Sequence, residues 1–304
     1  GAICGSSLAT AATMGRVALP ELRRMGYSGS LSTGALAAGG TLGILIPPSV
    51  ILIIYSILTE QNIAKMFLAA FVPGILAAIG YLIAIAIFVR IKPDSGPPTS
   101  YVGWRQRLNL FGQVWQILVI FFLVIGGIYL GWFTPTEGAS IGAAGTGIMA
   151  LFTKGFNFSD LIDVIKDTAV TSAMIFLVLL GAEFFNSFIA LTQITNELAT
   201  FVISNELSPY LVVFCILVLY ILLGCLMDSL AMILLTIPVF FPIIIELDFG
   251  MSIEEVAIWF GILTLIVVEV GLITPPVGLN VFIINKMAKN VPISDTFIGV
   301  LPFL

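Results

Sequence analysis

Two short polar pairs, Ser6-Ser7 and Asp228-Ser229, stand at the start of apolar runs, where their oxygens could bind a small cation. Hydroxyl, carboxylate and carbonyl oxygens are the ligands that small hard cations take. An aspartate such as Asp228 costs about 2.5–3.5 kcal/mol at the centre of a bilayer, so it needs a partner or a purpose there. Two roles are open for it, a cap on the helix that begins at Leu230 and a cation ligand.

Further polar side chains interrupt apolar segments. Glu183 and Glu269 lie in runs without a lysine or arginine to pair with them. Each is a candidate cation site, a candidate proton carrier or a group that simply bonds to hydroxyls. Asn280 could satisfy backbone groups at a helix break or contact a substrate. Residues 134–137, Thr-Pro-Thr-Glu, have instead the pattern of a capped turn that opens a helix.

The elements that must position these groups are interrupted helices. Residues 42–50 contain an adjacent proline pair, and residues 270–278 contain a second. Proline lacks an amide hydrogen and disfavours helical geometry before it, so each apolar run must become two half-helices joined by an unwound piece. Bare backbone at membrane depth is tolerated only where protein buries it or where it lines a wet cavity. Two such breaks in matching places are typical of a transporter site near the bilayer midplane.

Half-helix ends at these breaks have complementary charge preferences. N-termini favour a carboxylate, whereas C-termini and freed carbonyls favour a cation, so the pattern indicates Na+ coupled to an organic anion. The predicted cation ligands come from the two breaks and the two polar pairs: Gly43, Ile46 and Pro48 with Ser6 or Ser7, and Gly271, Thr274 and Pro276 with Asp228 or Ser229. The predicted substrate contacts are Ser6, Ser7, Asp228, Ser229 and Asn280.

The composition is that of a helical, polytopic membrane protein. Hydrophobic residues make up 59% and charged residues 10% of the 304 residues, and the mean hydropathy is +1.15. Soluble chains are only roughly half apolar and about a quarter charged. The sequence has no histidine, which excludes imidazole as a base, proton relay or metal ligand. Cys4, Cys215 and Cys225 have no metal-ligand spacing, and we interpret them as small buried hydrophobes without a disulfide.

Apolar length divides the chain into spans and re-entrant arms. The predicted order is a hairpin return arm to about residue 22, a broken span at 28–58, spans at 66–89, 110–130, 138–152 and 169–189, a second hairpin with arms 210–226 and 230–245, a second broken span at 253–287 and a last span from 297. Residues 158–167 predict a separate amphipathic helix at the interface. The predicted domains are 1–65 (first repeat), 66–168 (scaffold, with a cytoplasmic linker at 93–107), 169–208 (connecting span and periplasmic segment) and 209–304 (second repeat).

The basic residues indicate an orientation. If the first hairpin starts from the cytoplasm, every lysine and arginine except Lys65 falls on the cytoplasmic side, which is the established orientation signal. An odd number of crossings separates the hairpins, and residues 7–9, Ser-Leu-Ala, are repeated at 229–231. We therefore expect inverted repeats of a hairpin plus a broken helix.

Both ends of the sequence predict a fragment. Gly1 has no methionine before it, and the apolar run from Phe297 to Leu304 is too short to span. We therefore expect a chain truncated at both ends, with an incomplete first hairpin.

Five motifs, in their order and spacing, resemble the large membrane subunit of tripartite ATP-independent periplasmic (TRAP) transporters, the DctM-like permeases: GSSLATAATMG, LGILIPPS, GWFTPTEGAS, GCLMDSLAMI and GLITPPVGLN. The resemblance covers essentially the whole chain. It implies an elevator-type Na+ symporter of a bacterial or archaeal cytoplasmic (inner) membrane that carries C4-dicarboxylates, sialic acid or other carboxylates. It also implies a small four-helix membrane subunit and a periplasmic substrate-binding protein as partners, within the lipid bilayer and without nucleic acid. Family Na+ sites at hairpin tips and breaks coincide with the positions named above.

Other classes of function fit the sequence less well. A stand-alone Na+/divalent-anion symporter of the related fold would need no binding protein. An intramembrane aspartyl protease needs two facing aspartates, and only Asp228 lies at depth. A Ser-His hydrolase is impossible without histidine, and a channel does not explain inverted, broken helices. We therefore predict a transporter subunit and not an enzyme.

Overall fold

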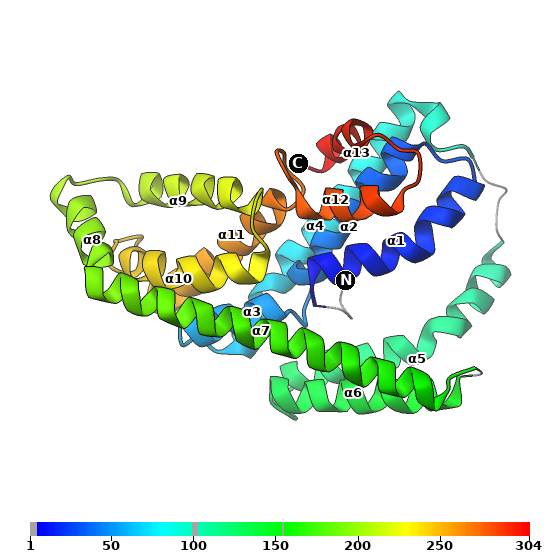
Figure 1. Cartoon of the computed structure of the whole chain (residues 1–304), viewed down its shortest axis with the longest axis horizontal. Coiled ribbons are helices and arrows are strands. Elements are labelled where there is room, and N and C mark those ends of the chain that lie inside the picture. The colour runs from blue at the N-terminus through cyan, green and yellow to red at the C-terminus, as the bar shows by residue number, and fades with distance from the viewer. Residues whose placement is uncertain (1–4, 99–102, 154) are drawn as a thin grey trace. The chain divides into compact units, whose positions relative to one another are not determined.

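The computed structural model describes residues 5–98, 103–153 and 155–304, and this described part is helical, without a strand. Its elements are, in chain order, α1 (Ser7–Arg24), α2 (Gly29–Leu45), α3 (Val50–Leu58), α4 (Ile63–Ile91), η1 (Pro93–Ser95), α5 (Trp104–Tyr129), α6 (Pro135–Phe152), α7 (Phe158–Thr192), α8 (Ile194–Ser204), α9 (Pro209–Gly224), α10 (Ser229–Ile245), α11 (Ile253–Gly271), α12 (Leu279–Met287), α13 (Ile293–Val300) and η2 (Leu301–Phe303) (Figure 1). The chain divides into two compact units, Gly1–Pro98 with Phe184–Leu304 and Thr99–Glu183.

Serine caps fix the starts of the first three helices. Ser6 is the N-cap of α1, and its hydroxyl accepts a hydrogen bond from the amide of Ala9 (3.5 Å). Ser28 caps α2 by accepting from the amide of Leu31 (3.2 Å), and Ser49 caps α3 in the same way. A side-chain cap satisfies an amide that the start of a helix leaves without an intrahelical partner.

Both predicted helix breaks are confirmed. The first lies between the end of α2 at Leu45 and the start of α3 at Val50, and the two half-helices are bent by 43°. The second lies between the end of α11 at Gly271 and the start of α12 at Leu279. In each case the proline pair falls within the interruption, because its residues cannot continue the hydrogen-bond ladder.

Apolar length supports a membrane protein. Of the described helices, α4 and α7 are each long and apolar enough to cross a membrane, and the bent pair α2–α3 would make a third span. The shorter apolar helices α9 and α10 match the predicted hairpin arms, and the turn between them falls at residues 225–228, where the tip is expected. The crossings expected at 110–130 and 138–152 stay predictions.

The predicted separate interfacial helix at 158–167 is wrong. Helix α7 runs without interruption from Phe158 to Thr192. No glycine or proline separates the amphipathic part from the apolar part, and the hydroxyls of Thr168 and Thr171 each bond a carbonyl one turn earlier (2.7 Å). These bonds are compatible with a continuous helix, so an amphipathic pattern did not imply a boundary. Part of the connecting segment expected at 191–208 is also helical, as α8.

The cysteines follow the prediction only in part. Cys225 is buried, and both it and Cys215 are free thiols. Cys215 is exposed, because it lies on the face of α9 that carries the exposed Leu211 and Leu222. Cys4 lies outside the described residues.

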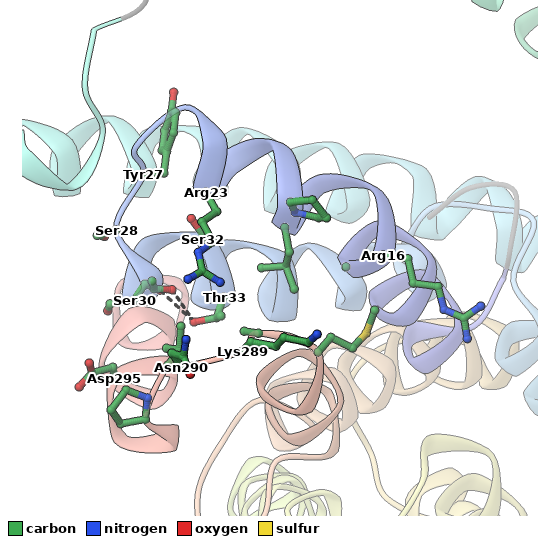
Figure 2. Close-up of a pocket in the computed structure, with 18 residues that line it drawn as sticks. Arg16, Arg23, Tyr27, Ser28, Ser30, Ser32, Thr33, Lys289, Asn290 and Asp295 are labelled. Atoms are coloured by element: carbon green, nitrogen blue, oxygen red, sulfur yellow. Dashed lines mark hydrogen bonds between the residues drawn. The ribbon is translucent and has the colours of Figure 1, made fainter.

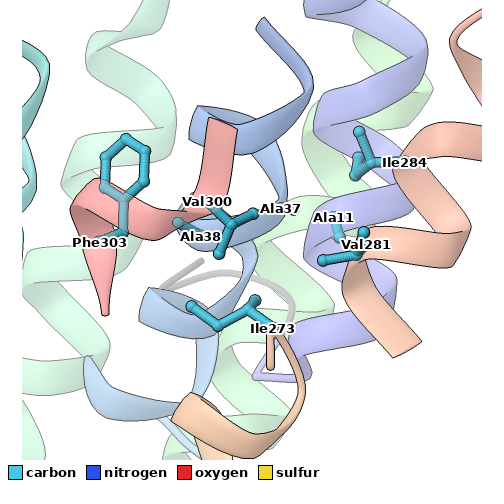
Figure 3. Packing of buried hydrophobic residues seen from close by; sticks show 8 residues of the cluster. All are labelled: Ala11, Ala37, Ala38, Ile273, Val281, Ile284, Val300 and Phe303. Carbon is cyan, nitrogen blue, oxygen red and sulfur yellow. The ribbon is translucent and has the colours of Figure 1, made fainter. Parts of the chain in front are cut away.

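One apolar core joins elements from both ends of the chain (Figure 3). Its buried members come from α1, α2, the second break, α12, α13 and η2: Ala11, Ala37, Ala38, Ile273, Val281, Ile284, Val300 and Phe303. Helices α2 and α13 approach most closely, since a side chain at Gly34 would overlap the carbonyl group of Gly299. Contact through glycine backbones is typical of helices packed in membranes.

Helix α6 begins with the capped turn predicted at 134–137. The hydroxyl of Thr134 accepts a hydrogen bond from the amide of Glu137 (3.3 Å), and the carboxylate of Glu137 accepts one from the amide of Thr134 (2.7 Å). These bonds favour the charged form of the carboxylate, and they hold the pKa of Glu137 below its usual range.

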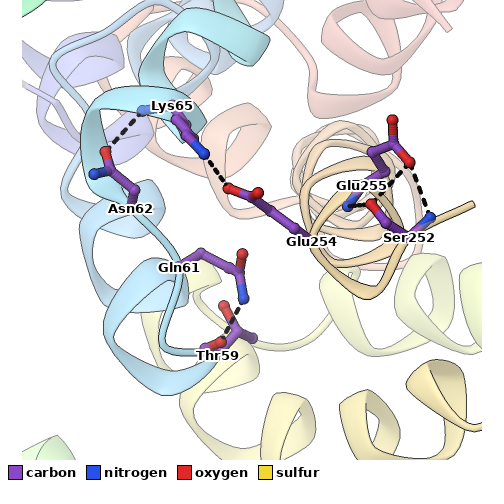
Figure 4. A network of polar contacts seen from close by, with 7 residues as sticks. All are labelled: Thr59, Gln61, Asn62, Lys65, Ser252, Glu254 and Glu255. Carbon is purple, nitrogen blue, oxygen red and sulfur yellow. Dashed lines mark hydrogen bonds and ion pairs between the residues drawn. The ribbon is translucent and has the colours of Figure 1, made fainter.

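An ion pair joins the starts of α4 and α11 (Figure 4). The Nζ of Lys65 lies 2.5 Å from a carboxylate oxygen of Glu254. The sequence places both residues on the non-cytoplasmic side, and their contact agrees with that placement. The side chains are 57% and 50% exposed, so solvent screening limits the pair to about 0–1 kcal/mol.

Candidate functional site

Glu269 is the centre of a polar cluster formed by the starts of α1 and α10. It lies two residues before the end of α11 and is 1% exposed. Its Oε2 accepts a hydrogen bond from the hydroxyl of Ser7, and its Oε1 accepts one from the hydroxyl of Ser229 at 3.2 Å. Both serines are buried first residues of their helices. A single carboxylate therefore joins the two predicted hairpin tips.

The charge around Glu269 comes from helix ends. No lysine or arginine forms an ion pair with it within the described part of the chain. A helix N-terminus carries about half a positive charge, and α1 and α10 both begin at the serines that bond this carboxylate. The sequence predicted that helix N-termini bind a substrate carboxylate. In the structure, the N-termini of α1 and α10 face the side-chain carboxylate of Glu269.

The first tip packs against the first break. A methyl group at Gly5 would lie 3.2 Å from the carbonyl oxygen of Pro48. A methyl group at Gly43 would lie 2.5 Å from the hydroxyl oxygen of Thr10 and 3.2 Å from the carbonyl oxygen of Ser6. The close approach of these backbones brings the Ser6 tip together with the predicted ligands Gly43 and Pro48.

The second tip packs against the second break in a similar way. The amide of Gly278 donates to the carbonyl of Cys225 (3.2 Å), and the thiol of Cys225 donates to the carbonyl of Pro275 (3.0 Å). A methyl group at Gly271 would lie only 2.7 Å from the Cα of Gly224. The end of α9 and the end of α11 are therefore in backbone contact beside the tip.

Two predicted ligands of the second half also form hydrogen bonds with backbone groups at helix ends. Asp228 is the N-cap of α10 and accepts a hydrogen bond from the amide of Leu230 (3.1 Å), so the capping role is confirmed. The hydroxyl of Thr274 donates to the carbonyl of Val270 (2.6 Å). Both side chains keep oxygen lone pairs beyond these bonds, so capping does not exclude a contact with a cation.

Asn280 links the second break to α2. It is fully buried, its backbone amide donates to the carbonyl of Leu272 (3.1 Å), and its side-chain amide donates to the carbonyl of Ala37 (3.4 Å). Its side-chain oxygen and the hydroxyl of Thr10 have no hydrogen-bond partner in the described part of the chain. Burying an unpaired polar atom costs about 1–3 kcal/mol, so these two oxygens are available to a ligand.

The structure separates the predicted site residues into two groups. Most gather at the tips and breaks: Ser6, Ser7, Gly43 and Pro48 in the first half, and Asp228, Ser229, Gly271, Thr274 and Asn280 in the second. Ile46 and Pro276 also lie within the breaks, but among the described residues the structure shows no contact between them and the tips: the side chain of Ile46 lies near Gly74 of α4, and Pro276 is exposed. Their carbonyls stay predicted ligands.

Two residues of the cluster were not among the predicted ligands. Glu269 had a usable signal, an acid in an apolar run without a base, but the sequence left its role open. Thr10 gave none, because a threonine in a helix is ordinary. Glu183, which gave the same signal as Glu269, is exposed on α7.

An apolar helical chain with a polar cluster at helix breaks has the architecture of a membrane permease. The family model of the tripartite ATP-independent periplasmic transporter, DctM component, matches residues 1–304, and the chain belongs to this family. The family match confirms the resemblance carried by the five sequence motifs.

The relatives of this chain are longer proteins that it matches over part of their length. The C4-dicarboxylate TRAP transporter large permease protein DctM of Pseudomonas aeruginosa is 33% identical over 100% of the chain and 69% of its own length. The sialic acid TRAP transporter permease protein SiaT of Haemophilus influenzae is 31% identical over 99% of the chain and 47% of its own length. The isethionate TRAP transporter permease protein DctMQ of Oleidesulfovibrio alaskensis is 28% identical over 100% of the chain and 47% of its own length. The chain thus spans about two thirds of the first relative and about half of the other two.

Proposed function

We propose that this chain belongs to the large permease subunit of a TRAP transporter that couples Na+ to the uptake of an organic carboxylate. The observation that carries the proposal is the meeting of both tips at Glu269. Asp228 is adjacent in sequence to one of its partners, Ser229, so two acids lie near the broken helices. Carboxylate and carbonyl oxygens without a basic partner favour a cation.

The substrate and the partners follow from the family. Relatives are named for C4-dicarboxylate, sialic acid and isethionate, which supports a small organic acid as the substrate. We propose a small four-helix membrane subunit and a periplasmic substrate-binding protein as partners. The location we propose is the inner membrane of a bacterium, which the apolar spans α4 and α7 support.

We further propose that residues 1–65 and 209–304 are inverted repeats that form one moving transport domain. Each tip packs against its own break, and Ser7 and Ser229 have the same place in the two halves, which supports a duplicated unit. Residues 66–168 would form the scaffold and 169–208 the connection. In an elevator mechanism the transport domain would carry the site from one side of the membrane to the other.

The test is Na+-dependent uptake by the full-length permease, reconstituted with its small subunit and supplied with its binding protein. Asp228→Ala and Thr274→Ala should each shift the Na+ activation curve to roughly tenfold higher concentration, which corresponds to about 1.4 kcal/mol. Ser140→Ala is the control, because Ser140 is exposed on α6 and bonds a carbonyl one turn earlier, as Thr274 does. Unchanged curves in both site variants would refute the assignment.

The alternative is a stand-alone symporter of divalent anions. The TRAP family match favours the tripartite reading. Uptake measured with and without the binding protein separates the two, since a stand-alone symporter works equally well in both conditions.

A further inference from the structure

A cavity of about 790 Å³ lies along the C-terminal half of α1 (Figure 2). The Glu269 cluster lies at the other end of this helix, at its start. The other walls of the cavity are the first turn of α2 and the segment that links α12 to α13. None of the predicted site residues is among its described lining residues. The basic residues of the sequence place these helix ends on the cytoplasmic side.

Basic side chains determine the charge of this cavity. Arg16, Arg23 and Lys289 line it, and Asp295 is the one acidic residue among its described lining residues. None of the three basic residues forms an ion pair within the part of the chain that the structure describes. Figure 2 shows the guanidinium group of Arg23 pointing toward the start of α2, whereas Arg16 extends toward the opposite end. The cavity therefore has a net positive charge that its own residues leave uncompensated.

Hydroxyl groups form the wall that Arg23 faces. Ser30 and Ser32 lie in the first turn of α2 and line the cavity, and their side-chain oxygens have no hydrogen-bond partner in the described part of the chain. Ser32 is only 6% exposed, so a buried hydroxyl is free to bond a ligand. The first turn of α2 adds the partial positive charge and free amides of a helix N-terminus, which bind phosphate groups well.

Apolar side chains border the charged wall. Leu19 and Met287 line the cavity. A ligand with a compact anionic group and an apolar remainder would match both kinds of surface, whereas a small dianion would use only one.

We propose that this cavity binds the phosphate group of an anionic phospholipid of the cytoplasmic leaflet. The planar guanidinium group of Arg23 offers paired donors that match phosphate oxygens, and Ser32 adds a donor from the opposite wall. Basic pockets between helices at the cytoplasmic surface suit anionic headgroups. The acyl chains would lie against the apolar residues that line the cavity, Leu19 and Met287. The inference rests on the cytoplasmic placement of α1 and does not require Na+ coupling.

The test is a titration of the purified full-length permease, with its small subunit and in detergent, with dioleoyl-phosphatidylglycerol, followed by the rise in unfolding temperature. Arg23→Gln and Ser32→Ala alter the cavity. Arg24→Gln is the matched control, because it removes the same charge at the next residue. The side chain of Arg24 is 75% exposed and pairs with Glu21 (2.8 Å) instead of lining the cavity. We expect roughly tenfold weaker apparent affinity in both cavity variants and wild-type affinity in the control.

Several results would overturn the proposal. Wild-type affinity in both cavity variants would remove the site, and an equal effect of Arg24→Gln would reduce it to general surface charge. An equal response to phosphatidylcholine, or inorganic phosphate binding as tightly as the lipid, would remove the anionic phospholipid as the ligand. Lipid binding is measured without transport, so failure of the Na+ proposal would leave this result interpretable.

Discussion

Residues 1–65 and residues 209–304 each contain a hairpin tip that packs against a helix break, and we call them the first and the second unit. The two units differ in their ionisable groups. In the first unit Ser6 caps the tip helix, and Thr41 lies two residues before Gly43, ahead of the proline pair. In the second unit the same places hold Asp228 and Glu269. At these two matching places only the second unit carries acids, so the two units are not chemically equivalent.

Hydrogen bonding follows the same division. Thr41 bonds the carbonyl of Ala38 in its own helix (2.6 Å) and the hydroxyl of Tyr81 on α4 (2.9 Å), but no group of the second half. Glu269 instead bonds both halves, through Ser7 and Ser229. A single carboxylate thus connects the two tips, whereas Thr41 at the matching place does not.

The largest expected effect is that of Glu269→Gln. The serine hydroxyls bond the two different oxygens of Glu269, and the amide replaces one of these oxygens with an NH₂ group that only donates. The substitution also removes the carboxylate group. We expect Na+-dependent uptake by the reconstituted full-length transporter to fall at least about tenfold, which corresponds to about 1.4 kcal/mol or more. Full activity in this variant would show that the difference between the halves has no role in transport.

Thr41→Val is the matched change in the first half. It removes two neutral hydrogen bonds, to the carbonyl of Ala38 and to the hydroxyl of Tyr81, each worth about 0.5–1.5 kcal/mol of stability. The unfolding temperature should fall slightly while the Na+ activation curve stays unchanged. A shift of that curve as large as in Glu269→Gln would mean that the halves contribute equally.

A second comparison concerns how tightly each tip packs. The added methyl group of Gly271→Ala meets the Cα of Gly224 at 2.7 Å, whereas that of Gly43→Ala meets the hydroxyl of Thr10 at 2.5 Å. A backbone atom cannot move aside, but a hydroxyl can rotate. We expect Gly271→Ala to lower the free energy of unfolding by about 2–3 kcal/mol and Gly43→Ala by about 1 kcal/mol.

Gly39→Ala is the control for both glycine variants. A methyl group at Gly39 has no neighbour within 4 Å, and alanine is up to about 1 kcal/mol better than glycine inside a helix. Gly39→Ala should therefore not destabilise the full-length protein in denaturant-unfolding measurements. A greater loss in Gly43→Ala than in Gly271→Ala would contradict the comparison.

Substitutions at the helix caps separate capping from charge, and the smallest change in stability is expected for Asp228→Asn. Asp228→Asn keeps a good cap, so the unfolding temperature should hardly change, but the lost charge should still weaken the Na+ dependence. Ser6→Ala should do the reverse, with a loss of about 0.5–2 kcal/mol of stability. Thermal unfolding and Na+ activation curves of both variants check this. An Asp228→Asn protein with normal Na+ dependence would leave Asp228 a cap alone.

Local chemistry explains which features the sequence could predict. A proline pair acts on its own helix and a cap acts on the next turn, so the two breaks and the caps Ser6 and Asp228 could be predicted from neighbouring residues. The end of an amphipathic pattern is a weaker signal, because it marks a change of surroundings and not a loss of helix. This is why α7 continues past residue 167.

The centre of the site could not be predicted in the same way. Ser7 and Glu269 are 262 positions apart, and no local pattern records which hydroxyl meets which carboxylate. The repeated Ser-Leu-Ala segments did indicate that Ser7 and Ser229 have equivalent places. Only the packing of α11 between the tips shows that they share one acceptor.

The backbone contact between Gly34 and Gly299 has a consequence for the lipid cavity. Helices that meet main chain to main chain have no side-chain layer between them that could rearrange, so α2 and α13 must shift as one piece. The first turn of α2 and the segment before α13 form two walls of the cavity, and their spacing should stay constant during any domain motion. A bound headgroup would then travel with the protein through each cycle instead of dissociating.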